Sequence, residues 1–296
     1  MALKLLLARS LIYLLSWVPL RLGHALAVPL GWLLDGLPLR KHPVIDTHLA
    51  LALPDLDHAA RRRLRRQHWV EMARLALELG AVWHWNAERL RARVQPVEGW
   101  DQITRANAAG QGCLVISAHM SNWEVMSLYG SLRQPITYLY KAPRDPRLNA
   151  LLVRSRERFG GRLVKSGSPA MRDILKTLRA GGNVGLLADQ QPKQGDGVFA
   201  PLFGVEALTM TLVNRLARHT GCAVLLASGR REPGGRGWSI RVVPADERIR
   251  SPDPVEAARC LNQWLENSIL EAPAQYLWSY KRYSIRPPGQ PSVYPG

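Results

Sequence analysis

The stretch Cys113-Leu-Val-Ile-Ser-Ala-His119-Met-Ser-Asn122-Trp123-Glu124-Val indicates both a fold class and a candidate site. Its apolar first half, which follows Gly112, is typical of a buried strand. The polar turn after it presents His119 and, five positions later, Glu124. A neutral imidazole can accept a hydroxyl proton near neutral pH when a second group fixes its tautomer. Because a turn into a helix can bring Glu124 back to the ring, the spacing predicts a base and its orienting carboxylate.

The position of this pair favours a catalytic interpretation over a chance spacing. A single His-x4-Glu arises often by chance, so the spacing alone has little specificity. In α/β sheets, however, sites gather at the carboxyl ends of strands, and His119 follows such an end. A base with its orienter also needs no protein nucleophile, which suits direct acyl transfer to an alcohol.

Predicted strands and helices alternate from residue 100 onward. Apolar runs predict strands at 113–117, 136–140, 183–187, 223–227 and 240–243. Helices are predicted at 146–159, 169–180, 208–219 and 254–272, with an exposed loop at 192–197. Before them, Asp57 is expected to cap a helix that runs to about Val82. This order predicts an α/β domain with a central sheet flanked by helices.

The first 38 residues are strongly hydrophobic and are predicted to form a helical membrane anchor. Neither residues 5–20 nor residues 22–39 supply the roughly 20 uninterrupted apolar residues of a comfortable span. The anchor is therefore expected either to span the bilayer or to lie in its interface. A buried helical hairpin is the alternative. Basic residues follow at Arg40, Lys41 and 61–66, which predicts that residues 39–296 form a cytoplasmic domain.

The composition is strongly basic, with 40 Lys and Arg against 23 Asp and Glu and a formal net charge of +17. Such an excess favours polyanionic partners: nucleic acid, an anionic membrane surface or an acidic carrier protein. No zinc finger or aromatic-basic strand motif supports nucleic acid. The three widely spaced cysteines, Cys113, Cys222 and Cys260, fit buried thiols in a reducing compartment.

Two further charged residues are candidates for the same site. On the predicted helix 146–159, three arginines share one flank, whereas Arg156 alone falls at the opposite edge of the buried face. Arg156 is therefore expected to point into a site. Asp189 ends an apolar strand, and it is expected either to pair with such an arginine or to cap the next turn.

At this point the sequence resembles the late acyltransferases of lipid A biosynthesis, within the lysophospholipid acyltransferase group. The resemblance rests on ordered blocks that, with the hydrophobic N-terminus, cover nearly the whole chain. They are Ser117-Ala-His119-Met-Ser-Asn122-Trp123-Glu124, Arg156-Glu-Arg-Phe-Gly160-Gly161-Arg162-Leu-Val, Ala188-Asp189-Gln190-Gln191, Val198-Phe-Ala-Pro-Leu-Phe203-Gly204-Val-Glu-Ala-Leu-Thr209 and Pro273-Ala-Gln275-Tyr-Leu-Trp278-Ser-Tyr-Lys-Arg282-Tyr. One departure is Tyr280, which stands where many members have histidine.

The resemblance implies a mixed sheet of the glycerolipid acyltransferase type and transfer of a fatty acyl chain from acyl carrier protein. The acceptor would be a hydroxyl of a lipid A precursor, Kdo-modified lipid IVA or a partly acylated form, at the cytoplasmic face of the bacterial inner membrane. His119 would act as general base with Glu124. Arg156, or backbone N–H groups near residues 121–123, would bind the oxyanion. Contacts to substrate are implied for Arg156, Asp189, Asn122 and Trp123, and no metal or cofactor is expected.

Other classes of protein remain alternatives to be tested. An acyltransferase for a lysophospholipid or another glycolipid would share the His119–Glu124 pair. A non-enzymatic protein that binds membranes or polyanions would explain the charge alone, and would make His119 dispensable. A serine hydrolase would need a Gly-x-Ser-x-Gly motif, and NAD or nucleotide enzymes would need glycine-rich phosphate loops; the sequence contains neither.

Overall fold

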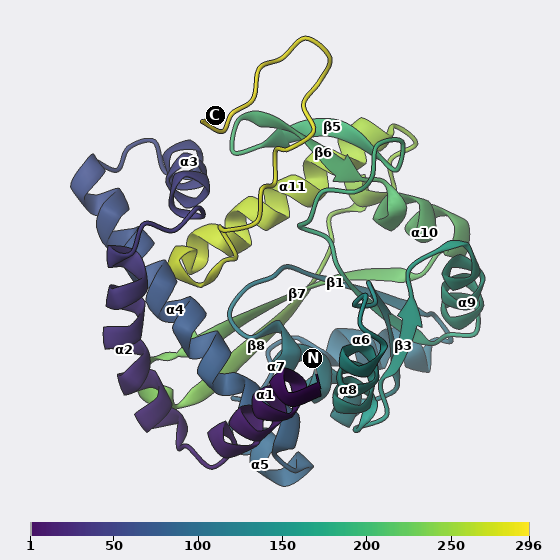
Figure 1. Cartoon of the computed structure of the whole chain (residues 1–296). Helices are drawn as coiled ribbons and strands as arrows, with labels where there is room; N and C mark the ends of the chain where they lie inside the picture. Colours follow the sequence, from purple (N-terminus) through teal and green to yellow (C-terminus); the bar gives the residue numbers. More distant parts are fainter. Residues whose placement is uncertain (1, 296) are drawn as a thin grey trace.

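A computed structural model describes residues 2–295, apart from the side chains of residues 2–8, 168 and 169. Its centre is a six-stranded mixed sheet with the strand order β3-β2-β4-β1-β7-β8 (Figure 1). The strands are β1 Cys113–Ser117, β2 Ile136–Tyr140, β3 Arg162–Lys165, β4 Asn183–Leu187, β7 Ala223–Glu232 and β8 Gly237–Pro244. All neighbours pair in parallel except β8, which is antiparallel to β7. The predicted mixed sheet flanked by helices is confirmed.

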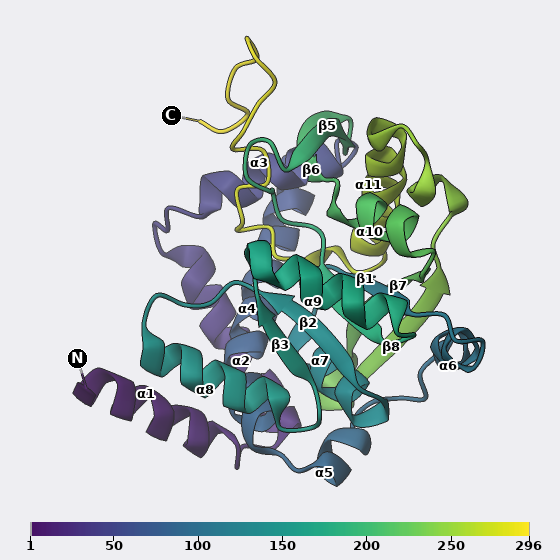
Figure 2. The ribbon, with the colours of Figure 1, turned by 90° about the vertical axis from the view of Figure 1, so that its right-hand side faces the viewer.

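Helices surround the sheet, as Figure 2 shows from a second side. They are α1 Ala2–Leu15, α2 Leu20–Gly36, α3 His42–Ala52, α4 His58–His84, α5 Ala87–Arg91, α6 Trp100–Ala108, α7 Trp123–Arg133, α8 Pro146–Glu157, α9 Ser168–Arg179, α10 Leu212–Thr220 and α11 Pro254–Glu271. Several begin at side-chain caps that the sequence dictates. Asp57 accepts a hydrogen bond from the N–H of Ala60 at 2.6 Å, as predicted, and Asp145 and Asp253 cap helices whose first residue is proline.

Two apolar cores, one on each side of the sheet, hold the domain together. Alternate residues of a strand point to opposite faces. Leu114 and Ile116 of β1 therefore join a core with α9, α10 and α11. Cys113 and Val115 face the other way, toward a core with α6, α7 and the end of α4. The first core contains the larger share of the buried side chains, and the second borders the cavity described below.

The structure differs from the sequence-based expectation at the hairpin of β5 and β6, at the start of α10 and at β3. Residues 208–210 were expected to begin a helix, but they belong to β6 Val205–Met210, which pairs with β5 Gly197–Leu202 as a separate antiparallel hairpin. Its turn contains Phe203 and Gly204 with φ of 50° and 73°, the backbone that a two-residue hairpin turn requires. Helix α10 therefore starts only at Leu212, and the predicted loop ends where β5 begins. The short edge strand β3 was not predicted.

The hydrophobic N-terminus forms α1 and α2, which meet at a sharp bend. Among the described residues, no single helix has the length and apolar character needed to cross a bilayer. Residues 9–15 and α2 reach that length and composition only as a pair, across a bend of 119°. The predicted membrane anchor, and the division of the chain near residue 38, stay predictions.

Candidate active site

Two neighbouring parallel strands bring His119 and Asp189 together. Ser117 at the end of β1 lies opposite Leu187 at the end of β4. Each strand is followed, two residues later, by one of the two polar side chains, so both emerge at the same edge of the sheet. The N–H of Ala188 donates to the carbonyl oxygen of Ser117 at 2.9 Å and keeps the chains paired past the strand ends. The sheet thus fixes the two residues at the position typical of sites in α/β folds.

Asp189 holds both the backbone and the ring of His119. One carboxylate oxygen lies 2.8 Å from Nδ1 of His119, and the other accepts the His119 N–H at 3.1 Å. Burial disfavours the charged carboxylate, but the charge and hydrogen bonds of His119 outweigh burial, so the pKa of Asp189 lies below its ordinary value. A carboxylate at Nδ1 selects the tautomer with its proton there. Nε2 is then left with a lone pair, on a side chain that is 16% exposed.

The expected hydrogen bond between His119 and Glu124 is not formed, and the expectation for Asp189 is also wrong. Both side chains of the first pair are described, and Glu124 instead binds Arg156, through Nε at 2.8 Å and through Nη2. The physical reason is that α7 begins at Trp123, so its first turn carries Glu124 away from the strand end and toward α8. Among the described residues Asp189 pairs with no arginine and caps no turn; it lies at Nδ1 of His119, the position that the sequence suggested for Glu124.

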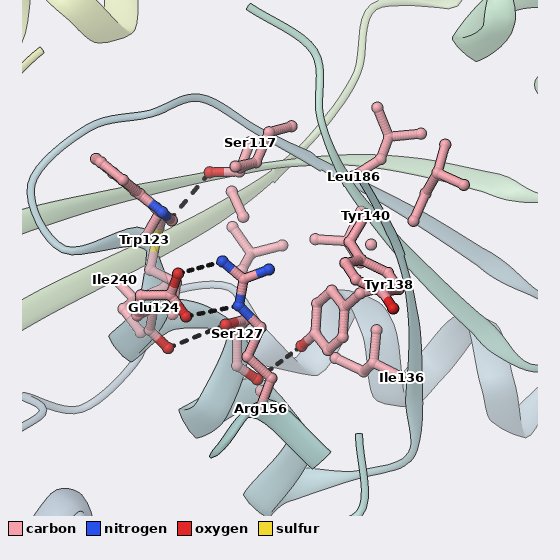
Figure 3. Close-up of a pocket in the computed structure, with 18 of the residues that line it drawn as sticks. Ser117, Trp123, Glu124, Ser127, Ile136, Tyr138, Tyr140, Arg156, Leu186 and Ile240 are labelled. Atoms are coloured by element: carbon pink, nitrogen blue, oxygen red, sulfur yellow. Dashed lines mark hydrogen bonds and ion pairs between the residues drawn. The ribbon is translucent and has the colours of Figure 1, made fainter. Parts of the chain in front are cut away.

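Arg156 lies where its place on the helix predicted. It projects from α8 toward the buried Glu124, and the two form a planar two-point ion pair (Figure 3). Burial disfavours the guanidinium charge, but Glu124 outweighs this effect and raises the pKa of Arg156 above its ordinary value. Arg156 therefore keeps its charge, close to the Glu124 carboxylate and partly shielded from water.

An apolar cavity of about 110 Å³ begins at this ion pair. Helices α6, α7 and α8 and the strands of the sheet all contribute to its lining, and Figure 3 shows Glu124 and Arg156 together with Tyr138 and Ile240 around it. Glu124, Arg156, Trp123 and Ser117 line it near the start of α7, and most of its remaining wall is apolar. Its other lining residues include Trp100, Ile103, Val115, Gly130, Ile136, Tyr138, Gly185, Ile240 and Val242.

Trp123 links this cavity to the imidazole. Its ring lies edge-on to the His119 ring, with the ring centroids 4.9 Å apart, and Trp123 also lines the cavity. His119 itself lies beside the cavity and outside its lining. The structure therefore brings five of the predicted residues into one cluster: His119, Trp123, Glu124, Arg156 and Asp189.

The sixth predicted residue, Asn122, has partners within the protein. Its Oδ1 caps α7 by accepting from the N–H of Val125 at 3.3 Å, and its Nδ2 donates to Glu78 at 2.9 Å. The preceding residue, Ser121, has φ of 53°, which is uncommon for a residue other than glycine. Its N–H donates to the carbonyl oxygen of Gln275 at 2.8 Å. These contacts fix the loop between β1 and α7, and a substrate contact of Asn122 stays a prediction.

Two more side chains, Gln190 and Tyr280, lie at the site but were not predicted from the sequence spacing. Nε2 of Gln190 lies 3.4 Å from Nε2 of His119. The hydroxyl oxygen of Tyr280 accepts the N–H of Gln191 at 3.1 Å. Tyr280 thereby supports the segment that carries Asp189, which gives a role to the position that departs from the family pattern. The block 188–191 was visible in the sequence, but its contact with the segment around residue 280 was not.

The chemical capacity of the arrangement follows from these contacts. It offers an imidazole whose Nδ1 is held by Asp189 and whose Nε2 has only the long contact to Gln190 among the described residues, a fixed cation at Arg156 and an apolar cavity that starts beside that cation. At the first turn of α7 the N–H groups of Val125 and Met126 donate to Asn122, whereas those of Trp123 and Glu124 have no acceptor among the described residues and can bind negative charge. These are the parts that attack of a hydroxyl group on an activated acyl chain requires.

Comparison with known proteins assigns the family. The family described as "Bacterial lipid A biosynthesis acyltransferase" matches residues 5–284, so the chain belongs to this family. It is therefore an acyltransferase, and the family's activity is acyl transfer onto lipid A. The resemblance inferred from the sequence blocks is confirmed.

Three curated relatives from Escherichia coli (strain K12) illustrate the range of acyl groups in the family. A lipid A biosynthesis lauroyltransferase is 27% identical over 283 residues, which cover 94% of this chain and 92% of the relative. A palmitoleoyltransferase is 28% identical over 256 residues, covering 86% and 82%. A myristoyltransferase is 21% identical over 250 residues, covering 83% and 76%. Their names differ in the acyl group, so similarity at this level leaves the acyl group of this protein open.

Proposed function

We propose that this acyltransferase moves a fatty acyl chain from a thioester on acyl carrier protein to a hydroxyl group of a lipid A precursor. The acceptor would be Kdo-modified lipid IVA or a partly acylated form, at the cytoplasmic face of the inner membrane. The observation that carries the proposal is the His119–Asp189 pair beside an apolar cavity that begins at Glu124 and Arg156.

The imidazole starts the reaction. His119 Nε2 accepts the proton of the acceptor hydroxyl as its oxygen attacks the thioester carbonyl carbon. Asp189 keeps the other proton on Nδ1 and stabilises the imidazolium that develops, because a buried carboxylate favours the charged ring. When the tetrahedral intermediate collapses, the carbon–sulfur bond breaks and His119 returns the proton to the thiol of the carrier. No covalent acyl-enzyme forms.

Arg156 stabilises the charge on the carbonyl oxygen. Glu124 holds its Nε and Nη2, which fixes the guanidinium plane at the start of the cavity. A fixed donor in a partly buried site costs no reorganisation during the reaction. Glu124 thus acts through Arg156 as a positioning residue rather than through His119. The N–H groups of Trp123 and Glu124 at the start of α7 supply further donors.

The cavity and the charge suit the two substrates. Apolar walls accept the alkyl chain of the donor, with its thioester carbonyl left beside Arg156. The formal net charge of +17 favours an acidic carrier protein and a phosphorylated glycolipid. The side chains described here supply the base, the oxyanion donor and the acyl cavity.

Acyl transfer by the purified protein tests the proposal. Labelled acyl carrier protein thioesters of several chain lengths would be offered with Kdo-modified lipid IVA and, in parallel, with a lysophospholipid. Transfer to the lipid A precursor is expected. Transfer only to the lysophospholipid would contradict the proposed acceptor, and transfer only from acyl-coenzyme A would contradict the proposed donor. The mass that is missing from lipid A in cells without this protein would then identify the acyl group.

A further inference from the structure

The outer side of α2 and the end of α1 form an exposed apolar surface, which we call the hairpin face. Its members are large apolar side chains that are more than a third exposed. They are Leu11, Tyr13, Leu14, Trp17, Leu22, Leu26, Leu30, Trp32, Leu33 and Leu37. Most other large apolar side chains of the described protein are buried or half-buried. A concentration of exposed apolar side chains on two successive helices marks an interaction site.

The inner side of α2 is fixed to the body of the protein. Leu20, Gly23, His24, Ala27 and Gly31 recur at helical spacing and are buried against α4. Leu22, Leu26 and Leu33 lie on the opposite side of the same helix. The small residues allow close packing: a Cβ atom at Gly31 would lie only 2.5 Å from the Cα of Val70 on α4.

A buried polar contact adds to this attachment. Nε2 of His24 lies 2.7 Å from a carboxylate oxygen of Glu78, and both side chains are at most 5% exposed. Glu78 also receives two hydrogen bonds from Arg231 of β7, each of 2.7 Å. Moving α2 away from α4 would leave these buried groups without partners, which is strongly unfavourable. Therefore α2 has one side committed to the protein and one side free.

Positive charge borders the hairpin face. Residues 9–41 contain the exposed basic residues Arg9, Arg21, Arg40 and Lys41. Their single carboxylate, Asp35, is 8% exposed and is bound by Arg65 at 2.8 Å and by Arg66 at 3.3 Å. The exposed charge beside the apolar side chains is thus basic, which complements anionic lipid headgroups.

We propose that the hairpin face docks in the surface of an anionic bilayer with α2 parallel to the membrane plane. The leucines of α2 enter the acyl region, Trp17 and Trp32 lie at headgroup level, and the basic residues contact lipid phosphates. The choice of a bilayer as the partner rests on the proposed function. The inference adds the mode of binding, which is one-sided and leaves the α2–α4 contact intact.

This docking places the candidate site close to the lipid. Helix α1 lies beside α8, the helix that carries Arg156, in both views (Figures 1 and 2). A groove between them is lined by Arg9, Tyr13 and Leu14 of α1, His84 of α4 and Leu151 of α8. A glycolipid held in the membrane surface would thus need to move only a short way along α8 to reach Glu124 and Arg156.

Binding to vesicles tests the surface. The full-length protein would be mixed with vesicles of phosphatidylglycerol and phosphatidylcholine, and with phosphatidylcholine alone. Binding to the anionic vesicles should weaken as salt rises. The double variant Leu26→Asp, Leu33→Asp should bind at least about tenfold more weakly. The substitutions remove two leucine side chains that would enter the acyl region and add negative charge beside anionic headgroups. Since both are more than half exposed, its melting temperature should be unchanged.

A matched substitution elsewhere provides the control. Leu270 on α11 is 44% exposed, and Leu270→Asp should bind vesicles like the wild type. Equal binding by the double variant and the wild type would overturn the proposal. So would equal loss in Leu270→Asp, and binding of equal strength to neutral vesicles would overturn the part played by anionic lipid.

Probe depth tests the orientation of α2. Because Cys113, Cys222 and Cys260 are buried, a fluorophore would label Leu22→Cys or Leu33→Cys selectively. Quenching by lipids brominated at known depths should place the two probes at equal depth. If α2 crossed the bilayer, its 1.5 Å rise per residue would separate the probes by about 16 Å. A depth difference near that value would overturn the proposal.

An assay in detergent separates this inference from the proposed function. In mixed micelles the acceptor needs no bilayer, so the Leu26→Asp, Leu33→Asp variant should transfer acyl groups at nearly the wild-type rate. A wild-type protein that binds anionic vesicles but transfers no acyl group would contradict the proposed function and support the docking. A wild-type protein that transfers acyl groups but does not bind anionic vesicles would support the proposed function and contradict the docking.

Discussion

The described residues include two histidine–carboxylate pairs, and their surroundings give them different properties. His24 and Glu78 are at most 5% exposed, and both oxygens of Glu78 are engaged by Arg231, His24 and Asn122. In the other pair, the ring of His119 is 16% exposed and its Nε2 faces no strong partner among the described residues, with Gln190 at 3.4 Å. The first pair is thus enclosed, with both Glu78 oxygens occupied and Nδ1 of His24 buried without a partner in the described part of the chain, whereas Nε2 in the second pair remains accessible.

The comparison teaches that a nearby carboxylate is not enough to identify a catalytic histidine. The two nitrogen–oxygen distances are nearly equal: 2.7 Å from Nε2 of His24 to Glu78, and 2.8 Å from Nδ1 of His119 to Asp189. What separates them is access: His119 contacts Trp123, which lines the apolar cavity, and His24 lies between α2 and α4. The predictions below test this division between a reactive pair and a structural one.

Loss of the His119 ring should have the largest effect. His119→Ala removes the base and should lower the rate of acyl transfer by about 10²–10⁴ with little change in melting temperature. His24→Gln should lower the melting temperature and change the rate only a few-fold. Initial rates with one acyl donor, and thermal unfolding of each purified variant, measure both effects. Near-normal transfer by folded His119→Ala would remove the basis of the division.

The partner carboxylate Asp189 comes next. Asp189→Asn keeps the shape of the side chain but no longer favours the proton on Nδ1 or the charged ring, so the rate should fall on the order of 10². Asp173→Asn, on the surface beside Arg162, is the matched control and should change little. Rates at saturating donor separate kcat from KM. A change confined to KM would show that Asp189 binds substrate rather than orients His119.

Glu78 should show the opposite pattern, with a large effect on stability and a small one on rate. Glu78→Gln leaves Arg231 and His24 with weakened partners in a buried place, which should cost about 3–5 kcal/mol of unfolding free energy. The rate of acyl transfer by the folded protein should fall only a few-fold, because Glu78 contacts the site only indirectly, through its hydrogen bond with Asn122. Urea unfolding measures the stability, and Glu247→Gln in an exposed ion pair provides the control. A loss of about 10² in the rate without loss of stability would show that Glu78 contributes to catalysis rather than to stability.

Acid should act on the His24–Glu78 pair in a defined direction. Burial disfavours the Glu78 carboxylate, but Arg231 and His24 outweigh burial and lower its pKa from 4.5 to about 2. A depressed pKa contributes stability that is complete above pH 4.5 and is lost as the pH falls toward 2. The unfolding free energies of the wild type and Glu78→Gln should therefore converge between pH 4.5 and 2. A difference that stays constant over this range would show that the charge of Glu78 contributes nothing.

The smallest expected effect is on the choice of acyl chain, through the apolar cavity beside the His119–Asp189 pair. A Cβ atom at Gly130 would lie 3.0 Å from Cδ1 of Ile136 and 3.2 Å from the hydroxyl oxygen of Tyr138. Gly130→Ala should therefore narrow the cavity and shift the preference toward shorter acyl donors by a few-fold per methylene pair, in line with pockets that select by size. Competition between donors of different length measures the shift. An unchanged preference would show that the acyl chain lies elsewhere.

Much of the main sheet could be predicted from the sequence, because its inner strands are short apolar runs between helices. Strands β1, β2 and β4 have the predicted bounds, since parallel strands buried on both faces are continuously apolar. The hairpin of β5 and β6 was missed because it lies outside the main sheet and its pattern is less regular. Residue 208 was also read as helical because an amphipathic helix follows it directly.

The members of the site were predicted better than their contacts. Arg156 was placed correctly because its helical position is a local property. The choice of partner for His119 depends on which strands are neighbours, and spacing along the chain does not contain that information. One signal was available: His119 and Asp189 each follow a predicted strand by two residues, so adjacent parallel strands would bring them together.

A double-mutant cycle on the rate of acyl transfer tests most directly whether Asp189, and not Glu124, works through His119. It compares Asp189→Asn and Glu124→Gln, each alone and each combined with His119→Ala. We predict that Asp189→Asn changes the rate of His119→Ala by less than about threefold, whereas Glu124→Gln retains its full effect in that background. The reverse result, with Asp189→Asn additive and Glu124→Gln without further effect, would contradict the assignment and restore Glu124 as the partner of the imidazole.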